Sequence, residues 1–323
     1  MNRITILGTV VLVVAGLWSA AWVYASGVIR QNLASLADAD GQTSPKLTCD
    51  QLDVGGFPLY FDVTCTGLAI TSGDLNATLA NVKASVVAYD PWHAVAFLTG
   101  PLAVSDAFTG SRHELDWKSL QASARLDGWR IGRISAVGDA LTLADIVGDR
   151  VPLGKAGHAE LHLLDIPAQH DAAKHLAALQ LYATVSDLNA PGPGIAAGKL
   201  TFEGVLTGLP DDVRTYGEAD LVRRWQAAGG KLQVVGFKGS DGDATSFDVT
   251  GNLALDAAFK PTGQLTIGSK GLVERFGTLV PAEWRGLVLG SPAADGTYHQ
   301  VLNLTSGMAF SGVLPIGALP AVQ

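Results

Sequence analysis

The stretch SLQASARL, residues 119–126, decides the fold class because apolar and polar side chains alternate along it without a break. A period of two is the spacing of a β-strand whose two faces meet different surroundings. Similar alternation, as in LNATLANV at residues 75–82, dominates from residue 46 onward, and glycine, Asp-Pro and Asn or Asp clusters interrupt it. The sequence therefore predicts a mainly β fold, with a large antiparallel β-meander that curves into a trough or half-barrel, since large sheets curl.

Two segments break the alternation and are predicted to form short helices. The first is AQHDAAKHLAAL at residues 168–179, and the second is EADLVRRWQAA at residues 218–228. In the second, Trp225 belongs to an apolar stripe, and Gly229 follows as a stop signal. The sequence PGPG between the two helices indicates a subdomain boundary near residues 190–197.

The N-terminal run ITILGTVVLVVAGLWSAAWVYA, residues 4–25, carries no charge. A helix of this length reaches about 33 Å, enough to cross a hydrocarbon core of about 30 Å. Arg3 precedes the run, and Trp18 and Trp22 lie toward its outer end, where indole rings favour the headgroup zone. We therefore expect a single transmembrane helix.

The alternative to a retained anchor is a cleaved signal peptide, with the sequence VYA at residues 23–25 as the cleavage site. Retention is favoured because the apolar run is longer than the 7–15 residues typical of a signal peptide. The predicted organisation is a membrane anchor at residues 1–30, a juxtamembrane helix and linker at 31–45, and an extracytoplasmic β-rich domain at 46–323. A short N-terminal tail is most simply left in the cytoplasm, which places the body outside.

Composition excludes some classes of partner. The chain has a net charge of −8, only 16% charged residues and no basic run, so we expect no nucleic-acid partner. A hydrophobic content of 48% suits either a large core or a substantial apolar groove.

The two cysteines, Cys49 and Cys65, flank a hairpin-like segment. If its turn centres on Phe57, Cys49 lies opposite Cys65, and a disulfide forms there in an oxidising compartment. The alternative is a pair of buried free thiols.

No stretch carries a catalytic or cofactor-binding motif, and we assign no catalytic, cofactor-binding or metal-ligating residue. His158, Glu160 and His162 would share one strand face, but neighbours on a strand face lie about 6.6 Å apart, which makes a poor chelator. The polar face of a half-exposed strand is the favoured interpretation. Phe57, Tyr60 and Phe61 could contact a lipid or a partner, or could simply be a turn and the first core strand.

Several motifs together resemble a Gram-negative bacterial envelope family catalogued as domain of unknown function 2125. They are the N-terminal anchor, Cys49, GFPLYFDVTC at residues 56–65, RWQAAGG at 224–230, the Gly-x-Leu repeats within 251–267, and LPIGALP at 314–320. The resemblance implies no reaction and no functional residues. A weaker similarity to AsmA-like anchored proteins, which have one N-terminal helix and long β-meanders, implies a trough for acyl chains.

These observations predict a single-pass protein of the bacterial inner membrane with its body in the periplasm. We expect a non-enzymatic binder or shield of a lipid or other apolar ligand, with Trp225 as a further apolar contact beside the aromatic residues named above. The alternative is a structural or scaffold protein of envelope assembly without a ligand, and an enzyme is the third reading. The ligand and any protein partners are not encoded in recognisable motifs.

Overall fold

The computed structural model describes residues 3–42, 44–218, 220–272 and 292–322. The chain divides into two compact units, residues 1–123 with 141–153, and residues 124–140 with 154–323. The described residues contain 17 strands in one hydrogen-bonded sheet, and nearly all the strand pairs are sequence neighbours in antiparallel register, as in a meander. The predicted mainly β, antiparallel class is therefore confirmed. Whether the body is one domain or two subdomains divided near 190–197 stays a prediction; the turn at residues 191–194 joins two strands of the second unit.

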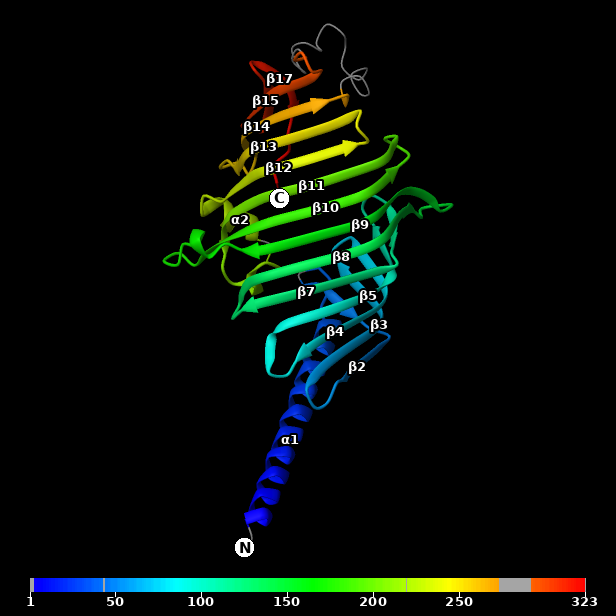
Figure 1. The fold of residues 1–323 in the computed structure, drawn as a ribbon, viewed down its shortest axis with the longest axis vertical. Coiled ribbons are helices and arrows are strands. Elements are labelled where there is room, and N and C mark those ends of the chain that lie inside the picture. Colours follow the sequence, from blue (N-terminus) through cyan, green and yellow to red (C-terminus); the bar gives the residue numbers. More distant parts are fainter. Residues whose placement is uncertain (1–2, 43, 219, 273–291, 323) are drawn as a thin grey trace. The chain divides into compact units, whose positions relative to one another are not determined.

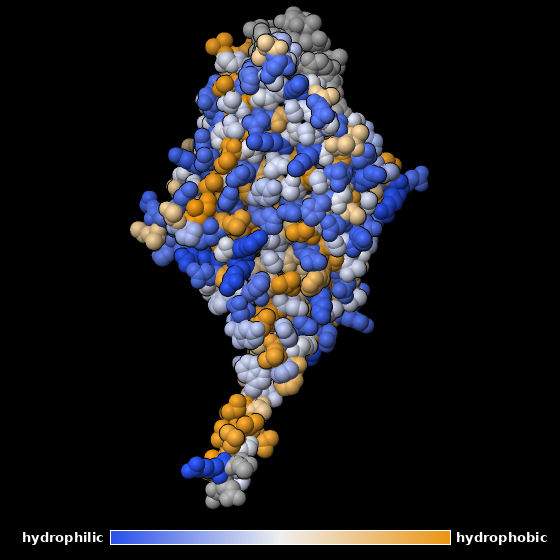
Figure 2. Space-filling view, in the orientation of Figure 1, coloured by the Kyte–Doolittle hydropathy of each residue, from blue (hydrophilic) through white to orange (hydrophobic). Residues whose placement is uncertain are grey.

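The first unit begins with one long helix, α1 (Arg3–Ala37), so the apolar run and the helical segment after it are continuous. Residues 5–37 of this helix are long and apolar enough to cross a membrane, by length and composition. Its N-terminal part extends beyond the strands of the unit (Figure 1), and the face of it seen in Figure 2 is mostly apolar above a charged tip. The strands that follow are β1 (Lys46–Thr48), β2 (Gln51–Gly55), β3 (Tyr60–Ser72), β4 (Leu75–Val87), β5 (Asp90–Asp106) and β6 (Arg112–Asp116).

Three strands connect the units in sequence: β7 (Ser119–Asp127), β8 (Arg130–Asp145) and β9 (Val151–Asp165). The second unit continues with β10 (Leu176–Ala190), β11 (Ile195–Pro210), β12 (Lys231–Asp241), β13 (Thr245–Leu255), β14 (Pro261–Lys270), β15 (Thr297–Thr305), β16 (Met308–Ser311) and β17 (Leu314–Ala318). Short helical turns η1 (Pro167–Gln169) and η2 (Val213–Thr215) and the helix α2 (Leu221–Ala227) interrupt this series.

The helix predicted at residues 168–179 is wrong. Only the 3-10 turn η1 forms there, and β10 already begins at Leu176. Leu179 is 1% exposed and pairs with Leu206 of β11. An alanine-rich apolar run is compatible with either a helix or a buried strand. Here burial in the sheet overrides the helix propensity of alanine.

The second predicted helix is confirmed as α2. It ends as the sequence indicates, because Gly229 has a φ of +72° and the Gly230 amide donates to the carbonyl of Trp225 at 2.9 Å. Trp225 packs against the core of the second unit, which is built on Ile131, Leu179 and Leu209.

Candidate functional site

The second unit carries an apolar sheet face that spans many strands. Phe202 of β11 lies opposite Phe237 of β12, and Phe237 lies opposite Val249 of β13. Val249 in turn lies opposite Ile267 of β14. Because paired residues point to the same side of a sheet, these four side chains share one face.

This apolar face extends in both directions along the strands. The face also carries Leu181, Ala183 and Val185 on β10, Leu200 and Leu206 on β11, Leu232 and Val234 on β12, Phe247 and Leu253 on β13, Leu265 on β14, and Leu302 and Leu304 on β15. The bulges in β11 and β12 keep the alternation in phase, since Val234 and Phe237 both face partners on one side of β13. The opposite face of the same strands is polar, with residues such as Lys238, Asp248 and Thr266.

Most side chains of the apolar face are half-buried and not part of a closed core. Phe202, Phe237, Phe247 and Val249 all retain partial exposure, whereas Val234 is among the few that are buried. The rings of Phe237 and Phe247 meet edge to face with centroids 5.0 Å apart. The face is therefore ordered by its own aromatic contacts while apolar area stays accessible.

A pocket of about 140 Å³ lies at one end of the apolar face. Its lining comes from the end of β10, the start of β11, the end of β12 and the start of β13, and includes Leu188, Ile195, Leu200 and Phe247. Glycine is required at position 239, because a Cβ there would lie 2.2 Å from the Phe247 ring. The absence of a side chain at Gly239 lets that ring lie over the neighbouring strand.

The other end of β11 is closed by α2. There the Trp225 indole donates to the Thr207 carbonyl at 2.8 Å and packs with Leu206 on the buried cluster around Leu179. Tyr216 donates its hydroxyl to the Pro210 carbonyl at 2.9 Å, and burial raises the pKa of this phenol to about 12. The apolar face thus runs from a filled core at α2 to an open pocket at the far strand ends.

The His158, Glu160 and His162 side chains form a hydrogen-bonded row on the polar face of β9. His158 Nε2 lies 2.7 Å from one Glu160 oxygen, and His162 Nε2 lies 3.0 Å from the other. His158 Nδ1 contacts Asp139 at 2.7 Å, and His162 Nδ1 contacts the Ser135 hydroxyl at 2.9 Å. Every ring nitrogen of the two histidines already has a partner.

The charges of this row stabilise one another. Hydrogen bonds from His158 and then His162 hold the pKa of Glu160 below its usual value, and Glu160 and then Asp139 raise the pKa of His158. Among the described residues, no group of three or more His, Cys, Asp or Glu side chains is arranged to hold a metal ion.

In the first unit, Cys49 and Cys65 form a disulfide with their Cα atoms 5.5 Å apart. The predicted register of the hairpin is wrong by three positions, because Cys65 pairs with Leu52 and Cys49 lies outside β2. The turn spans residues 56–59, where the Tyr60 amide donates to the Gly56 carbonyl. The bond therefore joins β3 to the break between β1 and β2.

The predicted aromatic contacts fall into two separate places. Phe57, Tyr60 and Phe61 surround Trp22 of α1, and the ring of Trp22 stacks on Phe61 with centroids 5.5 Å apart. Trp225 belongs to the second unit and contacts the core at α2. A role for these four side chains in ligand contact stays a prediction.

Sequence reasoning missed the apolar face as a site. Its signal was present in the same alternation that predicted the strands, in segments such as KLTF at residues 199–202 and SFDVTGNL at 246–253. What the sequence lacks is the register that places these segments beside one another, which depends on the bulges.

No curated protein and no solved structure matches the chain significantly. One family model does match, over residues 22–320, and its description is "Uncharacterized protein conserved in bacteria". This match covers the end of α1 and both units, and it says nothing of the weaker similarity to AsmA-like proteins. The chain therefore belongs to the bacterial family DUF2125, as motifs such as those at residues 56–65 and 314–320 predict.

Proposed function

We propose that this protein is anchored in the bacterial inner membrane by α1 and holds its β-rich body in the periplasm, where the second unit binds or shields a lipid acyl chain or another apolar ligand. The role is one of binding, without catalysis. The observation that carries the proposal is the half-buried apolar face of β10–β15 with its pocket.

Exposed apolar area of this extent favours an occupant. Removing apolar surface from water contributes about 25 cal/mol per Å². Monomeric proteins rarely leave large contiguous apolar patches open unless the patch binds something. A sheet face that is apolar along six strands and only half-buried is therefore better suited to a ligand than to water.

The dimensions favour an extended ligand over a compact one. Pockets for compact ligands have volumes of about 300–1,000 Å³, and this pocket has a volume of about 140 Å³. A chain that enters beside Leu200 and Phe247 would have to continue along the strands toward Val234. Hydrocarbon fits this path because nearly all of the accessible surface of the pocket is apolar, although several lining residues are polar.

The anchor and the disulfide support the location. The apolar helix meets the length and composition of a membrane span, and a disulfide such as Cys49–Cys65 persists in oxidising compartments like the periplasm.

Photo-crosslinking tests the ligand and its path together. Full-length protein would be purified from cells fed a diazirine fatty acid, irradiated, and mapped by peptide mass spectrometry. We expect labels at alternate positions of β13, on Phe247, Val249 and Leu253, and none on the interleaved Asp248 and Thr250, which lie on the opposite face and do not line the pocket. Labels confined to α1, or spread equally over both sets, would contradict the proposed face.

Native mass spectrometry with lipid extraction gives an independent readout. We expect co-purified lipid in the protein, its loss in Phe247→Asp, and its retention in Thr250→Asp, which adds the same charge to the same strand on the opposite face and away from the pocket. Circular dichroism checks that both variants fold. A folded, lipid-free protein with reproducible protein partners would instead identify a scaffold.

A further inference from the structure

The turn between β2 and β3, called here the aromatic turn (residues 56–61), is attached to α1 by two indole hydrogen bonds. Trp18 donates to the Pro58 carbonyl at 2.9 Å, and Trp22 donates to the Tyr60 carbonyl at 2.9 Å. The Trp22 ring also meets Phe57 edge to face and stacks on Phe61. The turn is therefore held at a defined height on the helix.

That height falls within the membrane if α1 crosses it. At 1.5 Å per residue, Trp18 lies about 22 Å and Trp22 about 28 Å along the helix from Arg3. The hydrocarbon core is about 30 Å thick, and any tilt of the helix lowers both positions further. With Arg3 at one boundary, Pro58 lies below the opposite boundary and Tyr60 lies close to it.

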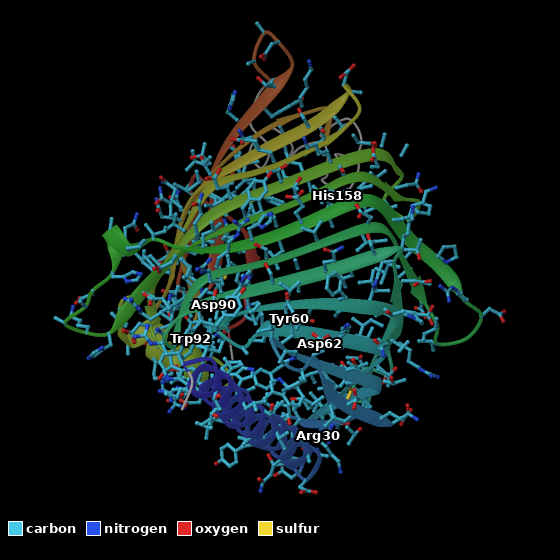
Figure 3. All side chains as sticks on the ribbon, turned by 60° about the horizontal axis from the view of Figure 1, so that its bottom comes forward. Arg30, Tyr60, Asp62, Asp90, Trp92 and His158 are labelled. Atoms are coloured by element: carbon cyan, nitrogen blue, oxygen red, sulfur yellow. A yellow bond between two sulfur atoms is a disulfide. The ribbon has the colours of Figure 1, made fainter. Side chains whose placement is uncertain are left out.

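The charges of the hairpin agree with this placement. Arg30, 12 residues beyond Trp18, donates to the Val54 carbonyl at 3.2 Å and lies 3.6 Å from Asp53. Arg30 lies about 18 Å farther along the helix than Trp18, beyond a hydrocarbon core that begins at Arg3. Its contacts therefore hold Asp53 on the water side of the boundary. No charged residue follows until Asp62, which is engaged by Ser85 and Lys83. Arg30, Tyr60 and Asp62 can be followed in Figure 3.

Four backbone carbonyls of the aromatic turn accept hydrogen bonds from groups within the protein. In hydrocarbon, an unpaired carbonyl costs several kcal/mol, so irregular backbone there needs partners within the protein. The Gly56 carbonyl accepts from the Tyr60 amide, and the Leu59 carbonyl accepts from the Ala88 amide at 2.9 Å. The indoles of Trp18 and Trp22 donate to the carbonyls of Pro58 and Tyr60. The carbonyls of residues 56, 58, 59 and 60 therefore need no hydrogen bond from water.

The exposed side chains at this edge are those that favour a membrane interface. Phe57 is 53% exposed, Leu59 49% and Tyr60 49%. The neighbouring turn between β4 and β5 adds Tyr89, and the start of β5 adds Trp92; they are 77% and 40% exposed. Asp90, the first residue of β5, directly follows this turn, and a carboxylate suits the headgroup level better than the hydrocarbon.

We propose that the aromatic turn inserts into the outer boundary of the bilayer that α1 crosses, and that it forms a second lipid contact which fixes the first unit against the membrane surface. The occupant of this apolar edge is lipid. The inference rests on the membrane anchoring in the proposed function and is independent of the apolar face in the second unit.

Depth-dependent quenching tests the inference on full-length protein in vesicles of phosphatidylethanolamine and phosphatidylglycerol. An environment-sensitive nitrobenzoxadiazole (NBD) dye would be placed on Leu59→Cys, on Tyr89→Cys, and on Asp74→Cys at the opposite end of β3. We expect lipids spin-labelled high on the acyl chain to quench the dye at position 59, and headgroup-labelled lipids to quench it at 89. The dye at 74, about 40 Å away along the strand, should keep its full fluorescence.

A fourth probe on Leu12→Cys, within α1, separates the two ideas. If position 12 is quenched by deep spin labels while 59 behaves like 74, the anchor holds and the insertion of the turn is refuted. If position 12 is not quenched, the anchoring fails, and the insertion fails with it. Aqueous iodide identifies another occupant: a dye at 59 that neither iodide nor spin-labelled lipid reaches is covered by protein, which also overturns the proposal.

Discussion

Two tryptophans on helices make the same hydrogen bond in very different surroundings. Trp22 of α1 donates its indole N–H to the Tyr60 carbonyl at 2.9 Å, and Trp225 of α2 donates to the Thr207 carbonyl at 2.8 Å. Beside Trp225 lies Leu179, which is 1% exposed, whereas beside Trp22 lies Phe57, which is 53% exposed. The hydrogen bond positions the helix in both cases, but only Trp225 adds a side chain to a closed core.

The difference indicates what each region is built for. Around Trp225 the apolar contacts are satisfied within the protein, so that end of the second unit provides stability. Around Trp22 the ring contacts are ordered while the outer faces of the rings stay open, so that edge of the first unit suits an apolar environment. Substitutions should therefore affect stability in the second unit more strongly than in the first.

The largest effect is expected for Trp225→Ala. Truncating a large aromatic side chain in a core costs about 3 kcal/mol or more, and the free energy of unfolding should fall by that order. Trp225→Phe keeps most of the packing and loses the bond to the Thr207 carbonyl, at a cost of about 1 kcal/mol. Urea unfolding of the protein in detergent measures both. Equal losses for the two variants would contradict a packing role for the indole.

Removing the disulfide should be nearly as costly, and its effect should be confined to the first unit. The bond joins residues 16 positions apart, and closing a loop of this length contributes about 3 kcal/mol through the unfolded state. For the double variant Cys49→Ala with Cys65→Ala, we expect faster hydrogen exchange in β1–β3 and unchanged exchange in β11–β13. Faster exchange in both sets of strands would show that the two units do not respond separately.

A smaller effect is expected for Trp22→Phe. The phenyl ring can still stack on Phe61, but the Tyr60 carbonyl loses its donor, which costs about 1 kcal/mol. In detergent, hydrogen exchange of residues 57–61 should rise while the midpoint of global unfolding changes little. Val23→Ala is the matched control because Val23 is 63% exposed on the same helix. A large drop in the unfolding midpoint would instead place Trp22 in a core.

Much of the fold follows from the sequence because its signals are local. An uncharged apolar run long enough to span a membrane predicted α1. The apolar stripe that includes Trp225, followed by Gly229, predicted α2. Alternation predicted the strands. The error at residues 168–179 arose because Leu176 to Leu179 belong to a strand whose partners are distant in sequence, and local propensity cannot reveal that burial.

The candidate sites were harder to predict because they depend on register. The Gly67 backbone has a φ of +61°, and a Cβ there would lie 2.0 Å from Asp50, so glycine permits the close approach of the break between β1 and β2. That break leaves the register unchanged, because β1 and β2 pair with β3 in one continuous register. The three-position error for Cys65 comes from the turn at residues 56–59, which is centred later than Phe57, and apolar periodicity does not reveal the position of that turn. The partners of Trp18 and Trp22 lie about 40 residues away in the sequence, and only the fold brings them together.

The smallest effect on stability is expected on the polar face of β9, where the side chains interact through charged hydrogen bonds and not through apolar packing. Hydrogen bonds to Glu160 and Asp139 raise the pKa of His158 above its usual value of 6.5. Since the folded-state pKa is the higher one, the stabilisation is fully present below pH 6.5 and is lost as the pH rises through the raised pKa.

Titration of the His158 ring by NMR measures this shift directly. In Glu160→Gln the ring loses its main charged partner, so its pKa should move back toward 6.5, and the fall of stability with rising pH in that window should flatten. Glu203→Gln is the control, because Glu203 accepts from Gln180 on the same polar face. If His158 titrates identically in the protein and in Glu160→Gln, then the contact at 2.7 Å contributes no charge stabilisation. The row would then be held by the Asp139 contact and by the β-ladder alone.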